Sequence, residues 1–132
     1  MKRLLAAGFP SMYQITKVFR AAERGRLHNP EFTMVEWYRL GDDLQAGMEL
    51  LSQLADCLLQ RGAADRVTYR DVFLQHAAVD PLAASSPELA KRAAELGISL
   101  PAANIEDRDL WLDLIFAERV QPQLGWQAPQ II

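Results

Sequence analysis

Two patterns of hydrophobic residues divide the chain. Between residues 12 and 39 apolar positions alternate with polar ones, whereas beyond Gly41 they recur at steps of three and four. Alternation predicts strands, and the longer period predicts helices. "MYQITKVF" (12–19) and "EFTMVEWYR" (31–39) are expected to be strands, joined by the loop "RAAERGRLHNP" (20–30). The pair predicts an antiparallel β-hairpin with a long loop.

Helices are expected on both sides of this hairpin. "KRLLAAG" has the pattern of a helix end that stops at Gly8. A longer amphipathic helix is expected after Gly41, ending before Gly62. Its apolar positions are Leu44, Met48, Leu51, Leu54, Ala55 and Leu58.

Three shorter helices are predicted at 67–79, 85–97 and 104–120. Thr68 and Ser86 are the expected N-caps of the first two, and Gly97 is the expected terminator of the second. In the third helix the residues expected to point inward are Leu110, Leu114, Ile115 and Ala117. The apolar pair Ile131 and Ile132 at the end of the chain suggests a strand cut short.

These elements predict an α+β fold, an antiparallel hairpin packed with four or so helices. At 132 residues the chain has the length of one domain. A lone hairpin is marginal in water. The hairpin therefore packs on these helices, joins a sheet in another chain, or belongs to a larger domain.

The charge distribution is asymmetric although the net charge is only −3. Residues 1–39 hold seven basic and three acidic residues, a balance of +4, and residues 40–132 hold seven basic and fourteen acidic residues, a balance of −7. A positive segment on a negative chain suggests that an anion is handled near the amino terminus. The alternative is that the basic turns are simply solvated.

Composition narrows the class of protein further. The single cysteine, Cys57, excludes an internal disulfide, and its helical setting favours a small buried thiol. Two scattered histidines and one cysteine do not make a metal cluster, so no metal site is expected. No stretch approaches the length of a bilayer span, and "MKRLLAAGFP" is not a signal peptide. A cytoplasmic protein with no membrane partner is expected.

Glu36 lies among apolar residues in the second predicted strand. Alternation places it on one face with Phe32, Met34 and Tyr38. A buried carboxylate without a partner costs several kcal/mol at least, so it needs a cation or hydrogen-bond donors. A bound amine would serve, with the Tyr38 hydroxyl nearby. Pairing with Arg39 or Lys17, or a position at the sheet edge, is the alternative.

A second group of residues suits a phosphate and a planar base. Arg20 stands where strand gives way to loop, an anchored place for a guanidinium that grips phosphate or carboxylate. Arg26 and His28 could add phosphate contacts, and Phe32 could stack on a base. The ordinary alternative is that the loop arginines are solvated and that Phe32 belongs to a core.

The string "FRAAERGRLHNPEFTMVEWY" resembles motif 2 of the class II lysyl-tRNA synthetase family. The likeness is strongest to the shorter members that modify elongation factor P, and "MKRLLAAGFPSMYQITKVFR", "DPLAASSPELAKRAAELGI" and "EDRDLWLDLIFAERVQPQLG" extend it along the whole chain. The resemblance implies an antiparallel sheet flanked by helices. It also implies activation of lysine or β-lysine by ATP with Mg²⁺ to an aminoacyl-adenylate, followed by transfer to elongation factor P or tRNA.

The resemblance assigns a role to each matching residue. Arg20 would be catalytic, holding the α-phosphate and stabilising its developing charge. The ATP-binding set would be Arg20, His28, Asn29 and Phe32, with Phe32 stacked on adenine. Glu36 and Tyr38 would bind the amino groups of lysine or β-lysine.

The sequence also departs from the family pattern. Ala22 replaces an acid expected to contact the nucleotide, and Glu23 is displaced from it by one place. Leu27 stands where tRNA-charging members carry a second arginine. Motif 1, the upstream substrate segment, motif 3, the later magnesium-binding acids and an anticodon domain are not found in the sequence. Residues 1–132 are therefore interpreted as a partial catalytic domain, with a helix end and the motif 2 hairpin at 1–39 and a mainly helical insertion at 40–132.

This interpretation predicts a truncated lysyltransferase-like protein whose chain alone forms no adenylate, with retained ATP binding in question. One alternative is a stand-alone nucleotide- or protein-binding remnant. Another is a module completed by a second chain, with self-association through the unpaired hairpin edge. Because no anticodon domain is found, elongation factor P is favoured over tRNA as the acceptor.

Overall fold

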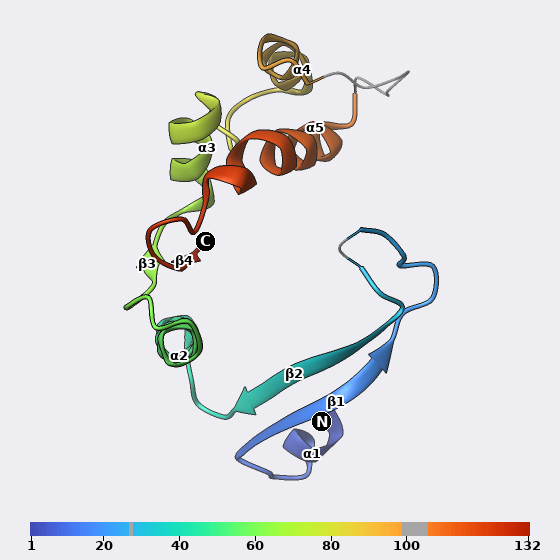
Figure 1. The fold of residues 1–132 in the computed structure, drawn as a ribbon, viewed down its shortest axis with the longest axis vertical. Helices are drawn as coiled ribbons and strands as arrows, with labels where there is room; N and C mark the ends of the chain where they lie inside the picture. Colours follow the sequence, from blue (N-terminus) through green and yellow to red (C-terminus); the bar gives the residue numbers. More distant parts are fainter. Residues whose placement is uncertain (27, 99–105) are drawn as a thin grey trace. The chain divides into compact units, whose positions relative to one another are not determined.

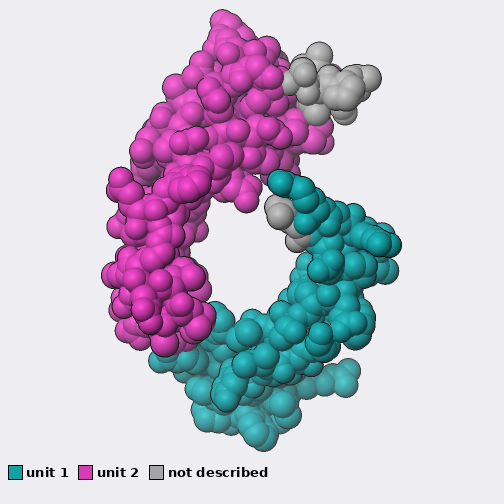
Figure 2. Space-filling view, viewed as in Figure 1, with its two compact units in different colours: residues 1–47 teal, residues 48–132 magenta. Residues whose placement is uncertain are grey.

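The computed structural model describes residues 1–26, 28–98 and 106–132. It confirms an α+β fold with an antiparallel hairpin and several helices (Figure 1). The chain divides into two compact units, which we call the hairpin unit (residues 1–47) and the helical unit (residues 48–132) (Figure 2).

The hairpin unit follows the sequence pattern closely. After α1 (Lys2–Ala6), Gly8 takes a φ of +96°, and β1 (Ser11–Phe19) then pairs antiparallel with β2 (Glu31–Arg39) (Figure 1). Ser11 lies opposite Arg39 and Phe19 lies opposite Glu31. Both strands lie within one residue of their predicted bounds. The alternation of apolar and polar residues had predicted the two strands and their antiparallel arrangement.

The two faces of the hairpin differ in character. One face carries Phe32, Met34, Glu36 and Tyr38, opposite Val18, Thr16, Gln14 and Met12. The other face carries large apolar side chains that are more than half exposed, namely Tyr13, Ile15, Phe19 and Val35. Within the described part of residues 1–47 no residue is fully buried. The hairpin unit therefore has no core of its own among these residues.

Helix α2 (Leu44–Leu59) confirms the predicted long helix. Asp43 accepts a hydrogen bond from the Ala46 N–H at 2.8 Å, and Gly62, with a φ of +80°, follows the helix end. The predicted burial is wrong for Cys57, which is exposed. Ser52 is the one buried position of α2, and at about 100° per residue Cys57 lies roughly 140° around the helix from it. Several of its predicted apolar positions are exposed as well, namely Leu44, Leu51, Leu54 and Leu58.

The helical unit has a compact apolar core. It is built by α3 (Tyr69–Ala77), α4 (Ser86–Glu95) and α5 (Arg108–Ile115) (Figure 1). Phe73, Leu89 and Ile115 are fully enclosed. The Phe73 ring lies 4.6 Å from the Tyr69 ring, measured between centroids. These three helices, together with Val120 of the turn that follows α5, hold the described core of the unit.

The helix caps agree with the sequence at one position and differ at another. Thr68 is the N-cap of α3 as predicted, accepting from the Asp71 N–H at 3.1 Å. The N-cap of α4 is Ser85, not Ser86 as predicted. The reason is a capping box, in which the Ser85 N–H donates to the Glu88 carboxylate at 2.8 Å. Ser86 instead donates from its hydroxyl to the Glu106 carbonyl at 3.1 Å.

The last predicted helix changes its period partway along. Residues 104–105 of the prediction lie outside the described residues, and α5 continues after Ile115 as a π-helical turn, Phe116–Val120. Ile115 is buried as predicted and Leu110 and Leu114 are partly buried, but Ala117 is exposed. In a π turn the partner lies five residues along, so Val120 returns to the face of Ile115 and occupies the core instead.

A short parallel pair completes the helical unit. β3 (Asp65–Arg66) pairs with β4 (Gln130–Ile131), so the strand expected at the end of the chain is present. Its partner β3 was not predicted. None of the described helices combines the length and apolar character needed to cross a membrane.

Candidate nucleotide and amine site

A cavity of about 310 Å³ lies where the strands of the hairpin open into the loop. Its lining residues are Arg20, Glu23, His28, Asn29 and Phe32. The structure thus brings the whole predicted ATP-binding set together. It adds Glu23, to which the sequence had assigned no role in the site.

The strand register explains why Arg20 and Phe32 meet. Val18 lies directly opposite Phe32, and Arg20 follows Val18 by two residues on the same face. The Arg20 N–H donates to the Pro30 carbonyl at 2.8 Å, which extends the backbone pairing beyond β1. Side chains in such diagonal positions are within reach of each other when they are long or aromatic. The Arg20 guanidinium accordingly lies over the Phe32 ring, 5.2 Å from its centroid.

The loop returns His28 and Asn29 to the same cavity. Gly25 and His28 exchange two backbone hydrogen bonds, of 3.0 and 3.3 Å, which close the tip of the loop. Arg24 and Arg26 are exposed and do not line the cavity. Leu27, noted above for its departure from the family pattern, lies outside the described residues.

Arg20 already has an anionic partner. Its Nη1 lies 3.3 Å from Glu23 Oε2, and both side chains are about half exposed. The guanidinium is therefore held between a carboxylate and an aromatic ring. A cation placed over an aromatic face is attracted by the ring's electron-rich surface.

Glu36 has a neutral partner, on the same face of the hairpin as Phe32. Gln14, directly opposite in the register, donates from Nε2 to Glu36 Oε1 at 2.5 Å. The two cations considered as alternative partners pair elsewhere, Lys17 with Glu31 at 2.9 Å and Arg39 with Asp42 at 3.1 Å. Within the described residues no ion pair involves Glu36, so its charge is solvated by an amide rather than neutralised.

Glu36 and Tyr38 are both partly buried and share their face of β2. Glu36 lies four positions beyond Phe32, which corresponds to roughly 13 Å along a strand. The Phe32 ring and the Glu36 carboxylate thus lie at two separate places on one face of the hairpin. This arrangement can hold a ligand that carries a flat ring at one end and an amine at the other.

The described residues do not provide a ready magnesium site. No group of three or more metal-ligating side chains gathers within them. Glu23 is the only carboxylate in the cavity lining. Mg²⁺ binds through oxygen ligands, with one or two carboxylates beside substrate phosphates, and Glu23 is the one carboxylate of the lining that could serve.

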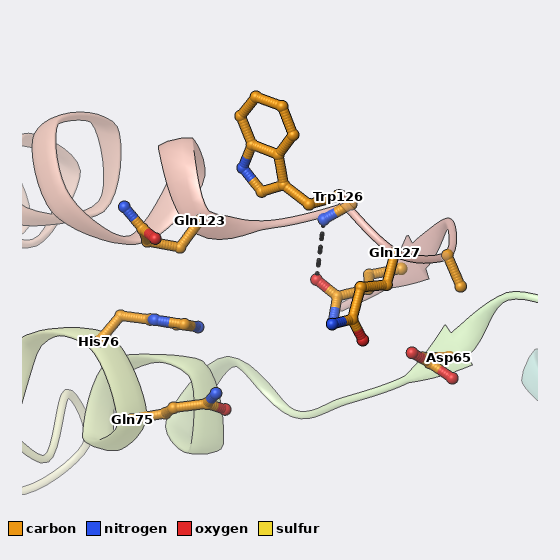
Figure 3. A pocket seen from close by; sticks show the side chains of 9 residues that line it. Asp65, Gln75, His76, Gln123, Trp126 and Gln127 are labelled. Atoms are coloured by element: carbon orange, nitrogen blue, oxygen red, sulfur yellow. Dashed lines mark hydrogen bonds between the residues drawn. The ribbon is translucent and has the colours of Figure 1, made fainter.

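The helical unit has a second cavity, of about 220 Å³, between β3, α3 and the C-terminal segment (Figure 3). Its side chains include Asp65, His76 and Trp126, and four glutamines at 75, 123, 127 and 130. Gly125 donates its N–H to the Gln130 side chain at 3.1 Å (Figure 3). No lysine or arginine lines it, so it lacks the cation that a phosphate needs. The hairpin cavity is the stronger candidate.

Comparison with known proteins identifies the family of the chain. Residues 1–83 match the family model described as tRNA synthetases class II (D, K and N). The chain belongs to this family. Its relatives include proteins named elongation factor P–(R)-β-lysine ligase from Vibrio cholerae, Edwardsiella ictaluri and Yersinia enterocolitica, which are 46%, 44% and 43% identical over 132 residues. The match covers 100% of this chain and 41% of each relative, so the chain spans about two fifths of their length.

The predicted resemblance is thereby confirmed, both to the class II synthetases and to the elongation factor P lysyltransferases among them. The sequence had missed two residues of the site. Gln14 stands opposite Glu36 in a strand register that only the structure reveals. Glu23 has no comparable signal in the sequence, since its position depends on the turn at Ala22, whose φ is +65°.

Proposed function

We propose that this chain carries the motif 2 part of an ATP-dependent ligase that activates lysine or β-lysine and transfers it to elongation factor P. The observation that carries the proposal is the Arg20 guanidinium lying 5.2 Å from the Phe32 ring centroid, in a cavity also lined by His28 and Asn29. The names of the relatives support the same reaction. Transfer to tRNA is the alternative.

The nucleotide part of the reaction rests on Arg20 and Phe32. An aromatic side chain stacks on the flat face of a base, which is the role of Phe32 toward adenine. Arg20 supplies guanidinium N–H donors to the α-phosphate and stabilises the negative charge that develops there when the amino-acid carboxylate attacks. His28 and Asn29 lie along the nucleotide and donate polar contacts.

The amine part rests on Glu36 and Tyr38. A carboxylate whose hydrogen-bond partner is a neutral amide keeps its full charge, and this charge attracts the ammonium group of lysine or β-lysine. Gln14 holds the carboxylate in place, and the Tyr38 hydroxyl offers a further hydrogen bond. The distance along the strand separates this contact from the phosphate grip.

We expect the 132-residue chain alone to form no adenylate. The cavity lining contains a single arginine, and that arginine is paired with Glu23. Catalytic groups that act as a unit fail together when one part is missing. Exchange of pyrophosphate into ATP with lysine or β-lysine above background would contradict this expectation. A chain that binds ATP but does not exchange pyrophosphate fits the alternative of a nucleotide-binding remnant. A cytoplasmic location stays a prediction.

The proposal is tested by calorimetric titration of the full 132-residue chain with ATP. Arg20→Ala removes charge-assisted hydrogen bonds worth about 1.5–3 kcal/mol, so affinity is expected to fall at least about tenfold. Arg39→Ala is the matched control, because Arg39 is a similarly exposed arginine of the hairpin that is paired with Asp42 and does not line the cavity. Equal losses in the two variants would overturn the assignment.

If this chain is a module completed by a second chain, the second chain is expected to bind along an edge strand of the hairpin. β1 and β2 form a sheet of two strands, so each has an unpaired outer edge among the described residues. A defined dimer in sedimentation, with slow amide exchange along one of these edges, would support that alternative.

A further inference from the structure

We propose that Glu23 is a positioning residue that latches Arg20. Its carboxylate holds the guanidinium over the Phe32 ring until a phosphate takes the carboxylate's place. The inference rests on the proposed function, because it concerns the same cavity. The family pattern assigns no such role to Glu23, because the acid it places at position 22 is replaced here by Ala22.

Three side chains lie together in the hairpin cavity. Arg20 Nη1 lies 3.3 Å from Glu23 Oε2, and the centre of the same guanidinium lies 5.2 Å from the Phe32 centroid. All three residues line the one cavity. The guanidinium therefore covers one face of the Phe32 ring within the cavity.

A backbone turn makes this placement possible. Ala22 has a φ of +65°, a left-handed conformation that residues other than glycine rarely adopt. The Arg24 N–H donates to the Ala22 carbonyl at 3.2 Å, which marks a tight turn at this point. The chain reverses after Arg20 and brings Glu23 back to it. Glu23, although displaced by one position in the sequence, therefore still lines the cavity.

An incoming phosphate competes with Glu23 for Arg20. Carboxylate and phosphate oxygens accept from the same kind of guanidinium N–H group, so a phosphate that takes the Nη1 donor displaces the Glu23 carboxylate from it. Glu23 also repels an incoming phosphate by its own charge. Because both partners of the pair are about half exposed, the pair is weak enough to open. Exposed ion pairs of this kind change an affinity by a factor of about two to five.

A matched acid lies on the same hairpin. Glu31 is paired with Lys17 at 2.9 Å and is similarly exposed, but it does not line the cavity. Replacing either acid by glutamine raises the net charge of the chain by one unit. Comparing Glu23→Gln with Glu31→Gln therefore separates the loss of the latch from a general gain in attraction for anions.

The experiment is a titration with ATP of the full chain, of Glu23→Gln and of Glu31→Gln, at low and at high salt. The latch predicts that Glu23→Gln binds ATP about two- to fivefold more tightly than the unchanged protein at low salt, with a smaller gain at high salt. Glu31→Gln is expected to stay close to the unchanged protein. ATP binding by Glu23→Gln that is equal to or weaker than that of the unchanged protein would overturn the latch, even if Arg20→Ala still weakens binding.

A second measurement tests the latch without nucleotide. The NMR signals of the Arg20 guanidinium report its partner in the free protein. Glu23→Gln is expected to shift them and Glu31→Gln to leave them unchanged. Failure of every variant to bind ATP would contradict the proposed function. The Glu23–Arg20 pair would then be tested by the NMR signals of the Arg20 guanidinium alone. Unchanged Arg20 signals in Glu23→Gln would overturn the latch.

Discussion

Gln14 and Glu36 face each other across the hairpin, and the Gln14 amide donates to the Glu36 carboxylate at 2.5 Å. The acid that stood out among apolar neighbours in the sequence is thus held by a neutral donor. Arg20 shows the opposite case, since its charge is matched by Glu23 at 3.3 Å. The carboxylate proposed for the amine keeps its charge, whereas the cation proposed for the phosphate is masked.

The first prediction concerns the affinity for an amine. Glu36→Gln removes the charge but keeps the shape of the side chain, so binding of lysine or β-lysine to the chain is expected to weaken at least about tenfold. Calorimetry or ligand-observed NMR measures this. Glu31→Gln, which removes an acid of the same strand already paired with Lys17, serves as the control and should change little. An unchanged affinity in Glu36→Gln would exclude the proposed amine contact.

The second prediction concerns the core of the helical unit. Phe73 is fully buried, and Phe73→Ala is expected to lower the free energy of unfolding by about 3–5 kcal/mol. Leu82 is 72% exposed, so Leu82→Ala should change it by less than about 0.5 kcal/mol. Urea unfolding followed by circular dichroism compares them. Similar losses in both variants would contradict the assigned core.

The third prediction uses two alanines in opposite conformations. Ala78 ends α3 with a φ of +49°, where glycine is favoured, so Ala78→Gly is expected to raise the free energy of unfolding by up to about 1 kcal/mol. Ala94 is exposed and lies within α4, where glycine is disfavoured. Ala94→Gly should lower the same quantity by roughly 0.5–1 kcal/mol. Changes of the same sign would contradict the helix end at Ala78.

The fourth prediction concerns acid pH. The backbone and hydroxyl of Ser85 donate to Glu88 and hold its pKa below the ordinary 4.5, and Arg70 does the same for the pKa of Asp80, ordinarily 3.8. A lowered pKa in the folded state means that the unfolded chain binds protons more readily. The stabilisation is therefore present above these ordinary values and is lost as pH falls through the lower, folded ones.

Urea midpoints at about pH 7 and about pH 3 measure this loss. The unchanged protein is expected to lose stability on acidification. Glu88→Gln, which cannot titrate, should lose less of it between the two pH values. An equal drop in both proteins would show that the capping box does not contribute to the acid sensitivity.

The sequence predicted the hairpin well because alternation and β-forming residues agree over both strands. The loop of 20–30 is too long to fix a register by itself, so the pairing of Gln14 with Glu36 required the structure. The cap at Ser85 was within reach of the sequence, since Glu88 three residues later completes a capping box. The local sequence pattern thus predicted the strands and helices more reliably than it predicted which residues lie opposite one another.

Other differences depend on information that a periodic pattern does not contain. Ala117 was expected to be buried because a 3.6-residue period was assumed. The π turn instead places Val120 in the core of the helical unit. Burial of Cys57 depends on what covers α2, which helix periodicity cannot tell. Glu23 entered the cavity through a left-handed alanine, a conformation that sequence statistics disfavour.

The most direct test of the nucleotide site is an ATP titration of the isotope-labelled chain observed residue by residue by NMR. The account predicts that the largest shifts fall on the side chains of Arg20, His28 and Phe32, and that Arg20→Ala removes them. Shifts confined to the second cavity, around His76 and Trp126, would contradict it, as would a full set of hairpin shifts that survives in Arg20→Ala.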